Sequence, residues 1–471
     1  MEPRREAAAW LAGAFAWHAA WIPVLGATND WDPAYYRSVA RHVARGDGDV
    51  TGALWNLLWL PPDLPFSAHL HWMPLPAWIL VPGMAVSAWG AHLTTALVAA
   101  TWAPLAWALA QKLGSTNTEA RVAAALAATG LAWGPWCTAP DSVALFGALG
   151  GAAFLALSHD RVGWAAGVAA LAALTRNDGA LLGLALALGA RGWRGVPIAS
   201  AGMLTMAAWQ LRNHGIMGPG WSDARAATAN VLDADDLATL VLGGAAPVDL
   251  LGRMRFLATE AWIALLSMWL VVLPLPASAW WLRPERWLRP ARAYALGMPL
   301  ILLLSAPGVA LSGSIFRSTA ALAPLACAVL VPAAAAVGRW GHAKRGYHPA
   351  FLAVVVVAAT AGVSLGLGAP GYFPGRMLPA DTCALLAEIP AGEAVFSTHP
   401  LLVEDHCDRP GVVLIRGMDA GRVADLAERY RVRWALLAPA DDGFGPSATV
   451  DDADALLPGW VRVSERVWRR P

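Results

Sequence analysis

The sequence predicts a polytopic, mainly α-helical transmembrane bundle with a small C-terminal α/β extramembrane domain. Of the 471 residues, 57% are hydrophobic and only 14% are charged, whereas soluble proteins average about 25% charged residues. The apolar residues form runs of roughly 15–25, close to the length that a helix needs to cross a bilayer. In lipid, only helices and closed barrels satisfy their own backbone hydrogen bonds, so such runs favour a helix bundle. The formal net charge of +1 gives no indication of nucleic-acid binding.

The apolar runs predict about eleven transmembrane spans. They cover residues 7–26, 91–111, 121–137, 142–158, 162–175, 179–190, 196–211, 258–282, 293–310, 317–337 and 349–368. Clusters of Lys and Arg fall in alternate loops, all on one side, which the positive-inside rule assigns to the cytoplasm. We therefore expect a multi-pass protein of the plasma (inner) membrane, with a cytoplasmic N-terminus and an extracytoplasmic C-terminus. The first run lacks a small-residue cleavage site and is expected to be retained.

The segment "HWMPLPAWILVPGMAVSAWG", residues 71–90, is apolar but does not fit this topology. A span here would place Lys112 outside and invert every later loop, and Pro74, Pro76 and Pro82 each remove a helical hydrogen bond. We expect an amphipathic or re-entrant helix at the outer face, with a twelfth span as the alternative. Residues 1–368 would then form the transmembrane domain, with an outer loop at 27–90.

Residues 369–471 alternate short β-like runs with one clear helix around 420–430, which predicts an exterior α/β domain. Cys383 and Cys407 both fall in this segment. An oxidising compartment would allow them to form a disulfide, and a reduced buried pair is the alternative. No spacing of Cys or His in the sequence indicates a zinc site.

The first outer loop begins with "ATNDWDPAYYRSVARHVARGDG". Asp30 and Asp32 stand beside the bilayer, where acidic residues have no anchoring use and must be solvated or paired. Tyr35 and Tyr36 follow, on a helix whose basic face can lie along the membrane surface. Farther along, His69 and Trp72 belong to a Trp- and His-rich stretch, which suits either sugar binding or an aromatic belt.

Four more charged residues follow at the ends of apolar runs. Asp141 in "CTAPDSVALF" can cap a helix or belong to a site. Arg176 and Asp178 in "ALTRNDGALLG" interrupt two short apolar segments, which is typical of binding sites, although the two can simply pair. Arg317 in "LSGSIFRSTAALAPLA" can snorkel towards the interface or hold a lipid-linked phosphate.

The order of these motifs resembles the GT-C superfamily of integral membrane glycosyltransferases, especially the branch of protein mannosyltransferases and aminoarabinose transferases. The resemblance runs over roughly residues 7–340 and is most specific in the loop 27–76. It implies inverting transfer of a sugar from a polyprenyl-phosphate donor to a glycan, lipid or protein acceptor at the outer face. Members differ in metal dependence, so a divalent metal cofactor is left open.

The resemblance also implies roles for individual residues. Asp32, three residues before Tyr35, matches the position of the general base, and Asp30 is the second candidate. The family more often has Asp-Glu where this chain has Asp32-Pro33, so the second carboxylate of that motif is missing. Arg317 falls where a basic residue contacts the donor phosphate. The remaining residues are assigned as follows: Arg176 as a second phosphate contact, and Tyr35, Tyr36, His69, Trp72, Asp141 and Asp178 in acceptor or sugar binding.

Two other functions are compatible with parts of the sequence. A transporter or flippase for a lipid-linked sugar would have charges near the bilayer midplane and inverted repeats, whereas no repeat is visible and the charges lie towards one face. A non-catalytic envelope scaffold is favoured only by the missing carboxylate at Pro33.

Overall fold

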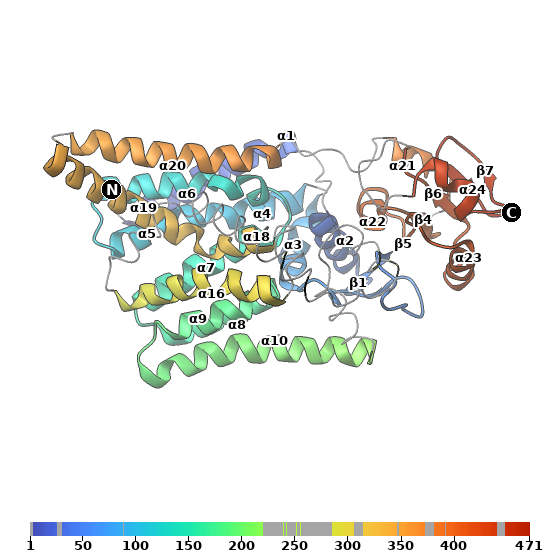
Figure 1. Ribbon diagram of the computed structural model, residues 1–471, viewed down its shortest axis with the longest axis horizontal. Coiled ribbons are helices and arrows are strands. Elements are labelled where there is room, and N and C mark those ends of the chain that lie inside the picture. Colours follow the sequence, from blue (N-terminus) through green and yellow to red (C-terminus); the bar gives the residue numbers. More distant parts are fainter. Residues whose placement is uncertain are drawn as a thin grey trace.

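The computed structural model describes residues 3–25, 31–87, 89–219, 285–305, 314–345, 348–372, 381–390, 392–439 and 448–471, with isolated positions between 239 and 255. Two parts follow one another along the long axis (Figure 1). One is a bundle of long helices. The other, at the opposite end from the N-terminus, is a C-terminal α/β unit formed by residues 381–471.

Small residues and Leu line the interior of the bundle and allow its helices to pack closely. Its described elements are α1 (Pro3–Leu25), α4 (Gly90–Ala100), α5 (Trp102–Lys112), α6 (Asn117–Thr129), η1 (Leu131–Cys137), α7 (Ser142–Ser158), α8 (Val162–Thr175), α9 (Gly179–Ala187), η2 (Gly192–Arg194), α10 (Gly195–Met217), η4 (Arg286–Leu288), α16 (Arg289–Ser305), α18 (Ile315–Thr319), η6 (Ala320–Leu322), α19 (Ala323–Arg345) and α20 (Pro349–Tyr372).

Three helical stretches in the described part of the chain are long and apolar enough to cross a membrane. They are Pro3–Val24, Gly90–Lys112 and Ile315–Arg345. The expected spans at 142–158 and 162–175 coincide with α7 and α8, which are shorter apolar helices. The expected span 258–282 lies outside the described residues. The total of about eleven spans therefore stays a prediction.

The expected span 121–137 is not one α-helix. Gly130 ends α6 in the left-handed conformation, with φ of +70°, and a 3-10 helix follows. Glycine adopts this conformation without the steric cost of a side chain. The chain direction therefore changes within this apolar run.

The segment 71–90 forms α3 (Leu75–Val86) and the connection to α4. Twelve residues of helix extend about 18 Å, which is too short for a bilayer core of about 30 Å. α3 lies against α2 (Trp31–Arg45), the helix of the first loop, and against α4. α3 is therefore a short helix beside α2, and its position at the outer face of the membrane stays a prediction.

A six-stranded sheet forms the centre of the C-terminal unit, in the order β2-β5-β4-β6-β8-β7. Its strands are β2 (Ala53–Leu54), β4 (Val395–Ser397), β5 (Gly411–Val413), β6 (Trp434–Leu436), β7 (Val461–Arg462) and β8 (Val467–Arg469). β2 comes from the first loop and pairs with β5 in parallel, so the sheet extends beyond residues 369–471. The remaining strands of that loop, β1 (Val50–Thr51) and β3 (Phe66–Ser67), pair with each other.

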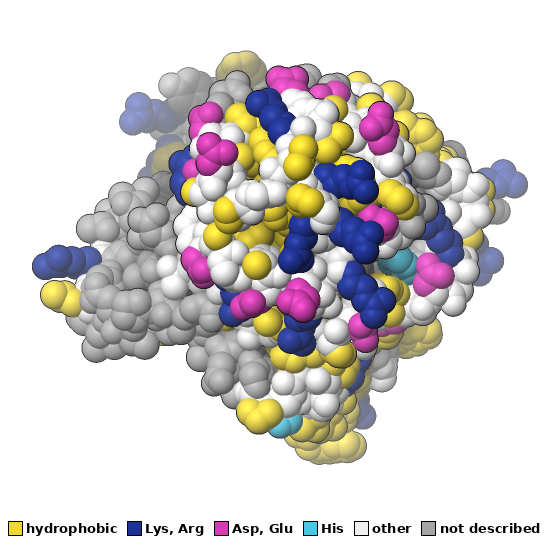
Figure 2. Space-filling model, turned by 90° about the vertical axis from the view of Figure 1, so that its right-hand side faces the viewer, with side chains coloured by type: hydrophobic (Ala, Val, Ile, Leu, Met, Phe, Trp, Pro, Cys, Tyr) yellow, Lys and Arg dark blue, Asp and Glu magenta, His cyan; other side chains and the backbone are white. Residues whose placement is uncertain are grey.

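Short helices surround this sheet: α21 (Thr382–Leu385), α22 (Pro400–Cys407), α23 (Ala420–Arg429), η7 (Val450–Asp452) and α24 (Ala453–Leu456). α23 is the helix expected around 420–430, and the side chain of Asp419 caps its N-terminus. Basic side chains gather across the end face of the unit (Figure 2). The expected disulfide between Cys383 and Cys407 is confirmed, and it ties α21 to the end of α22.

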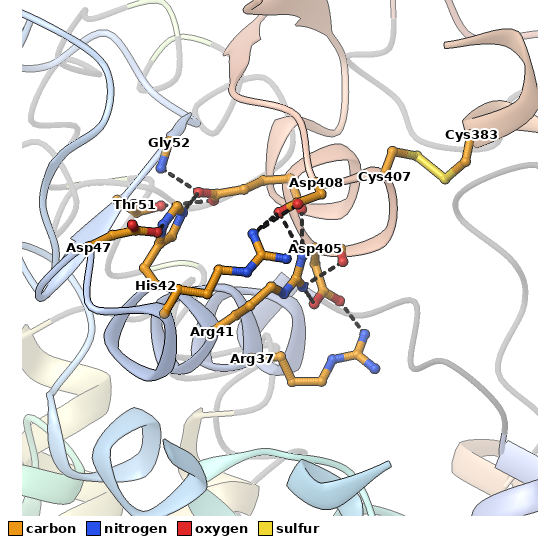
Figure 3. Close-up of polar contacts among 12 residues, drawn as sticks. Arg37, Arg41, His42, Asp47, Thr51, Gly52, Cys383, Asp405, Cys407 and Asp408 are labelled. Atoms are coloured by element: carbon orange, nitrogen blue, oxygen red, sulfur yellow. Dashed lines mark hydrogen bonds and ion pairs between the residues drawn. A yellow bond between two sulfur atoms is a disulfide. The ribbon is translucent and has the colours of Figure 1, made fainter. Parts of the chain in front are cut away.

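α22 also holds α2 through a network of ion pairs (Figure 3). Arg37 pairs with Asp405, and Arg41 donates to Asp405 Oδ1 at 2.8 Å. His42 contacts Glu404 Oε1 at 3.1 Å, and Arg45 contacts Asp408 at 2.8 Å. Glu404 also accepts hydrogen bonds from Thr51 Oγ1 and from the amide of Gly52. The basic face of α2 thus binds the C-terminal unit, a contact that the sequence did not indicate.

Gly150 provides a test of the helix packing. A Cβ at this position would lie 2.0 Å from the carbonyl oxygen of Ala321, four residues after Arg317. Gly150→Ala should therefore force α7 and η6 apart and lower the melting temperature in detergent. Gly167→Ala is the control, because a Cβ there meets nothing within 4 Å and the better helix former should leave stability equal or higher. Equal melting temperatures for Gly150→Ala and wild type would contradict this packing.

His42 provides a test of the contact between α2 and α22. The hydrogen bond to Glu404, helped by Asp47 and opposed by burial, raises the pKa of His42 above its ordinary value. The raised pKa makes protonated His42 stabilising; this stabilisation is complete below about pH 6.5 and is lost as pH rises through the raised pKa. His42→Gln should therefore lower the melting temperature by about 2–4 °C at pH 6 and by less at pH 9. His348→Gln, at an exposed histidine, should show no such difference, and an equal loss at both pH values for His42→Gln would refute the protonated contact.

Candidate active site

Asp32 lies in the first turn of α2 and contacts two other parts of the chain. Its Oδ1 accepts a hydrogen bond from Trp72 Nε1 at 2.9 Å. Its Oδ2 forms an ion pair with Nη1 of Arg317. The Asp32 side chain is 22% exposed, so it is both paired and accessible. Asp30, the other candidate base, lies outside the described residues.

Arg317 lies on α18 and reaches a second carboxylate. Its Nε is 3.6 Å from Oδ2 of Asp141. Asp141 is buried at the N-cap of α7, where its Oδ1 accepts from the amide and the hydroxyl of Ser142. The helix cap expected for Asp141 is confirmed, and its other oxygen faces Arg317; its role in a site stays a prediction. Arg317 thereby joins α2, α7 and α18.

Arg176 extends the same network. Its Nε donates to Asp178 at 2.9 Å, and its Nη1 donates to Ser142 Oγ at 3.1 Å. Its Nη2 lies 3.2 Å from Ser318 Oγ, next to Arg317 in the chain. Arg176 and Asp178 do pair, as the simpler interpretation predicted. Ser142, which contacts both Asp141 and Arg176, connects this pair to the cluster around Arg317.

One connected cluster therefore contains five of the charged residues expected from the sequence: Asp32, Asp141, Arg176, Asp178 and Arg317. Three carboxylates face two guanidinium groups, so the formal charge of these five side chains is −1. Tyr294 on α16 completes the cluster by donating to Asp178 Oδ2 at 3.2 Å. We refer to these six residues as the charged cluster.

An aromatic pocket of about 70 Å³ lies beside the charged cluster. Trp72 belongs to both, because its indole nitrogen binds Asp32 while its ring stacks on Tyr35 with centroids 4.4 Å apart. The ring centroid of Trp55 lies 5.3 Å from that of Trp72, and Trp55 lines the same pocket. Flat aromatic faces of this kind can pack against the apolar face of a sugar ring.

His69 also lines the pocket, but its polar atoms are engaged in the protein. Its Nε2 is 2.9 Å from Asp49 Oδ1, and its Nδ1 is 3.2 Å from the hydroxyl of Tyr35. Burial, only partly opposed by Asp49, lowers the pKa of His69, which favours a neutral ring. Its carbonyl accepts hydrogen bonds from Trp209 and Asn213. The side chain of His69 is fully buried, so His69 fixes the shape of the pocket.

Tyr36 is buried on the side of α2 that faces the charged cluster. Burial, reinforced by the charges of Asp32 and Asp141, raises the pKa of Tyr36 well above its ordinary value. Burial raises the pKa of Tyr35 in the same way. Both phenols are therefore neutral at physiological pH, and each can donate one hydrogen bond.

Sequence patterns missed several residues of this region. Ser142, Ser318 and Tyr294 join the expected charged residues, and Asp49 orients His69. Hydroxyl residues are common at helix ends, so the presence of a serine there did not indicate a functional site. No group of three or more His, Cys, Asp or Glu side chains among the described residues is placed to hold a metal ion.

No protein-family model and no curated protein sequence matches the chain. Several solved structures do match. ArnT from Cupriavidus metallidurans in the apo state has a TM-score of 0.54 and 15% identity, over 98% of this chain and 96% of that one. The structure of the same enzyme bound to undecaprenyl phosphate has a TM-score of 0.53 with the same identity and coverage.

The oligosaccharyltransferase from Archaeoglobus fulgidus in the apo form also matches, with a TM-score of 0.53 and 12% identity, over 91% of this chain and 69% of that one. Identities this low show the fold alone. The expected fold is confirmed: the chain has the fold of ArnT and of this oligosaccharyltransferase.

Proposed function

We propose that the protein is an inverting glycosyltransferase that moves a sugar from a polyprenyl-phosphate donor to an acceptor at the outer face of the membrane. The observation that carries this proposal is the contact of Arg317 with both Asp32 and Asp141. The candidate base, Asp32, is thus in direct contact with the candidate phosphate-binding residue, Arg317. The likeness to ArnT, whose structure is described as bound to undecaprenyl phosphate, supports a lipid phosphate as the donor.

Asp32 acts as the general base in this proposal. The acceptor hydroxyl gives its proton to the Asp32 carboxylate while the acceptor oxygen forms a bond to C1 of the sugar. The bond between C1 and the phosphate oxygen breaks, and its electron pair leaves with the polyprenyl phosphate. Inversion at C1 without a covalent intermediate requires the acceptor oxygen to attack from the face of the sugar opposite the leaving phosphate.

Arg317 holds the donor phosphate. Arginine can bind phosphate through two parallel hydrogen bonds, and a phosphate at Arg317 would compete with Asp32 for the same guanidinium. Donor binding would then weaken the ion pair of Asp32 and make its carboxylate a better proton acceptor. Arg176 reinforces the positive charge from the neighbouring position, because it contacts Ser318 beside Arg317.

The charge of the cluster suits this reaction. Its five charged side chains sum to −1, and the transferred proton neutralises Asp32. At the same moment the departing phosphate gains one negative charge. The charge held near Arg317 therefore stays constant, which limits the electrostatic cost of the step. Asp141 and Asp178 orient the two arginines.

The aromatic pocket receives the sugar or the acceptor. Trp72 places this pocket directly beside Asp32, and Trp55 supplies a flat apolar surface, while the buried Tyr35 supports the ring of Trp72. In this arrangement Trp72 aligns the base as well as the ligand. The acceptor is a glycan, a lipid or a protein segment that approaches from the side of the C-terminal unit.

Replacement of the base tests this proposal. Asp32→Asn keeps the shape of the side chain but cannot accept the proton, so turnover with a polyprenyl-phosphate sugar should fall about 10²–10⁴-fold. Transfer is measured with the purified protein, radiolabelled donor and membrane extract as the acceptor source. Asp63→Asn, at an exposed aspartate in the same loop, should keep full turnover. Full turnover in Asp32→Asn would remove Asp32 as the base, and absence of transfer by wild type with every donor would contradict the enzyme proposal.

Replacement of the phosphate contact is a separate test. Arg317→Lys keeps the positive charge but loses the planar fork, so the KM for the donor should rise about tenfold. The KM for the acceptor should change little, because this contact concerns the donor. Steady-state kinetics with each substrate varied in turn separates these effects. A fall in kcat at unchanged donor KM would refute a ground-state phosphate contact.

A further inference from the structure

A second and larger pocket lies on the other side of α2. Its volume is about 570 Å³, and α2, the end of α3, the start of α4 and α22 form its walls. Arg37, Arg41 and Arg45 line it and recur every four residues, so they share one side of the helix. Asp32 precedes Arg41 by nine residues, which is about half a turn around the helix axis. This pocket is therefore separate from the charged cluster.

The lining of the pocket is basic. The three arginines face the single carboxylate of Asp405, while Asp408 pairs with Arg45 and Arg41 from nearby. Arg41 bonds to the end of α22 through both of its terminal nitrogens (Figure 3). Arg37 is buried against His92 and Asp405. Both of these arginines fix the wall of the pocket and contribute positive charge.

Arg45 is the arginine that can bind a ligand. Its side chain is 50% exposed, and only its Nη1 bonds to Asp408. Within the described part of the chain, its Nε and Nη2 have no hydrogen-bond acceptor. These two nitrogens form one edge of the guanidinium fork, the arrangement that binds two oxygens of a phosphate.

An apolar path leads away from the same pocket. Trp89 lines the pocket and is 50% exposed. Leu93 and Leu97 follow at spacings of four residues along α4 and are 40% and 50% exposed. Gly90–Lys112, which contains these leucines, is one of the stretches able to cross a membrane. The pocket therefore opens at the end of a membrane span, at the level of lipid headgroups.

We propose that this pocket binds the phosphate headgroup of an anionic phospholipid. The phosphate bonds to the free edge of Arg45, and one acyl chain lies along Trp89, Leu93 and Leu97. A volume of about 570 Å³ accommodates a phosphoglycerol headgroup. The bound lipid contacts α2, α4 and α22 together, so it braces the helix that carries Asp32 from the side away from the reaction.

Lipid retention in the full-length protein tests this proposal. The protein is reconstituted in nanodiscs of phosphatidylcholine with increasing fractions of phosphatidylglycerol, and native mass spectrometry counts the lipids that stay bound. Wild type should retain phosphatidylglycerol in preference to phosphatidylcholine. Arg45→Gln should weaken this preference about tenfold, as expected for the loss of a charge-assisted pair, and Trp89→Ala should weaken it without touching any ion pair.

Two further variants separate charge from structure. Asp408→Asn breaks the same ion pair as Arg45→Gln but leaves the positive charge, so retention should equal or exceed that of wild type. Arg416→Gln is the matched control, because Arg416 is a half-exposed arginine that pairs with one carboxylate, Asp452, away from this pocket. Its retention should equal that of wild type.

Competition with inorganic phosphate tests whether the pocket binds a lipid or a soluble phosphate. Millimolar phosphate should displace little phosphatidylglycerol, because it lacks the acyl chain that contacts Trp89. Complete displacement together with wild-type retention in Trp89→Ala would show a site for soluble phosphate and overturn the lipid assignment. Equal retention of both lipids by wild type, or undiminished preference in Arg45→Gln, would refute the pocket altogether.

Discussion

The bridge from Arg317 to Asp32 and Asp141 is the interaction on which the arrangement of this region depends. It connects the first loop, the start of α7 and α18, which are separated by more than a hundred residues in each case. Asp141 is fully buried at its side chain, and a buried carboxylate without its partner would carry a large desolvation cost. The ion pairs therefore determine the relative positions of these segments as well as the chemistry available to them.

α2 is held from both sides, so the position of Asp32 depends on the helix bundle and on the C-terminal unit together. The side with Asp32 contacts the charged cluster and the aromatic pocket, and the side with Arg37 and Arg41 contacts α22. The disulfide between Cys383 and Cys407 restrains the end of α22, and strand β2 adds the first loop to the sheet. Any rotation of the C-terminal unit would consequently move Asp32, which is the base under the proposed mechanism.

Much of the cluster could be predicted from the sequence because a charge beside an apolar run is rare and costly. Asp32, Asp141, Arg176, Asp178 and Arg317 were identified on that ground, and the structure brings all five together. Partners that are ordinary on helix ends, such as Ser142, gave no such signal. The contacts of Glu404 and Asp405 with α2 join residues more than 350 positions apart, and local periodicity contains no information on such pairing. The number of spans is still a prediction, because only the hydropathy of the sequence defines it.

The missing carboxylate at Pro33 can be understood from the same geometry. Pro33 lies in the first turn of α2, where a proline costs no helical hydrogen bond and its restricted φ favours the helix. It therefore helps to begin α2, which starts at Trp31. A second acid next to Asp32 would add negative charge to a cluster that already sums to −1. Asp141 supplies a second carboxylate to Arg317 from another helix. Under the proposed mechanism the site thus keeps two carboxylates on its phosphate-binding arginine, and the proline gives the base a defined position.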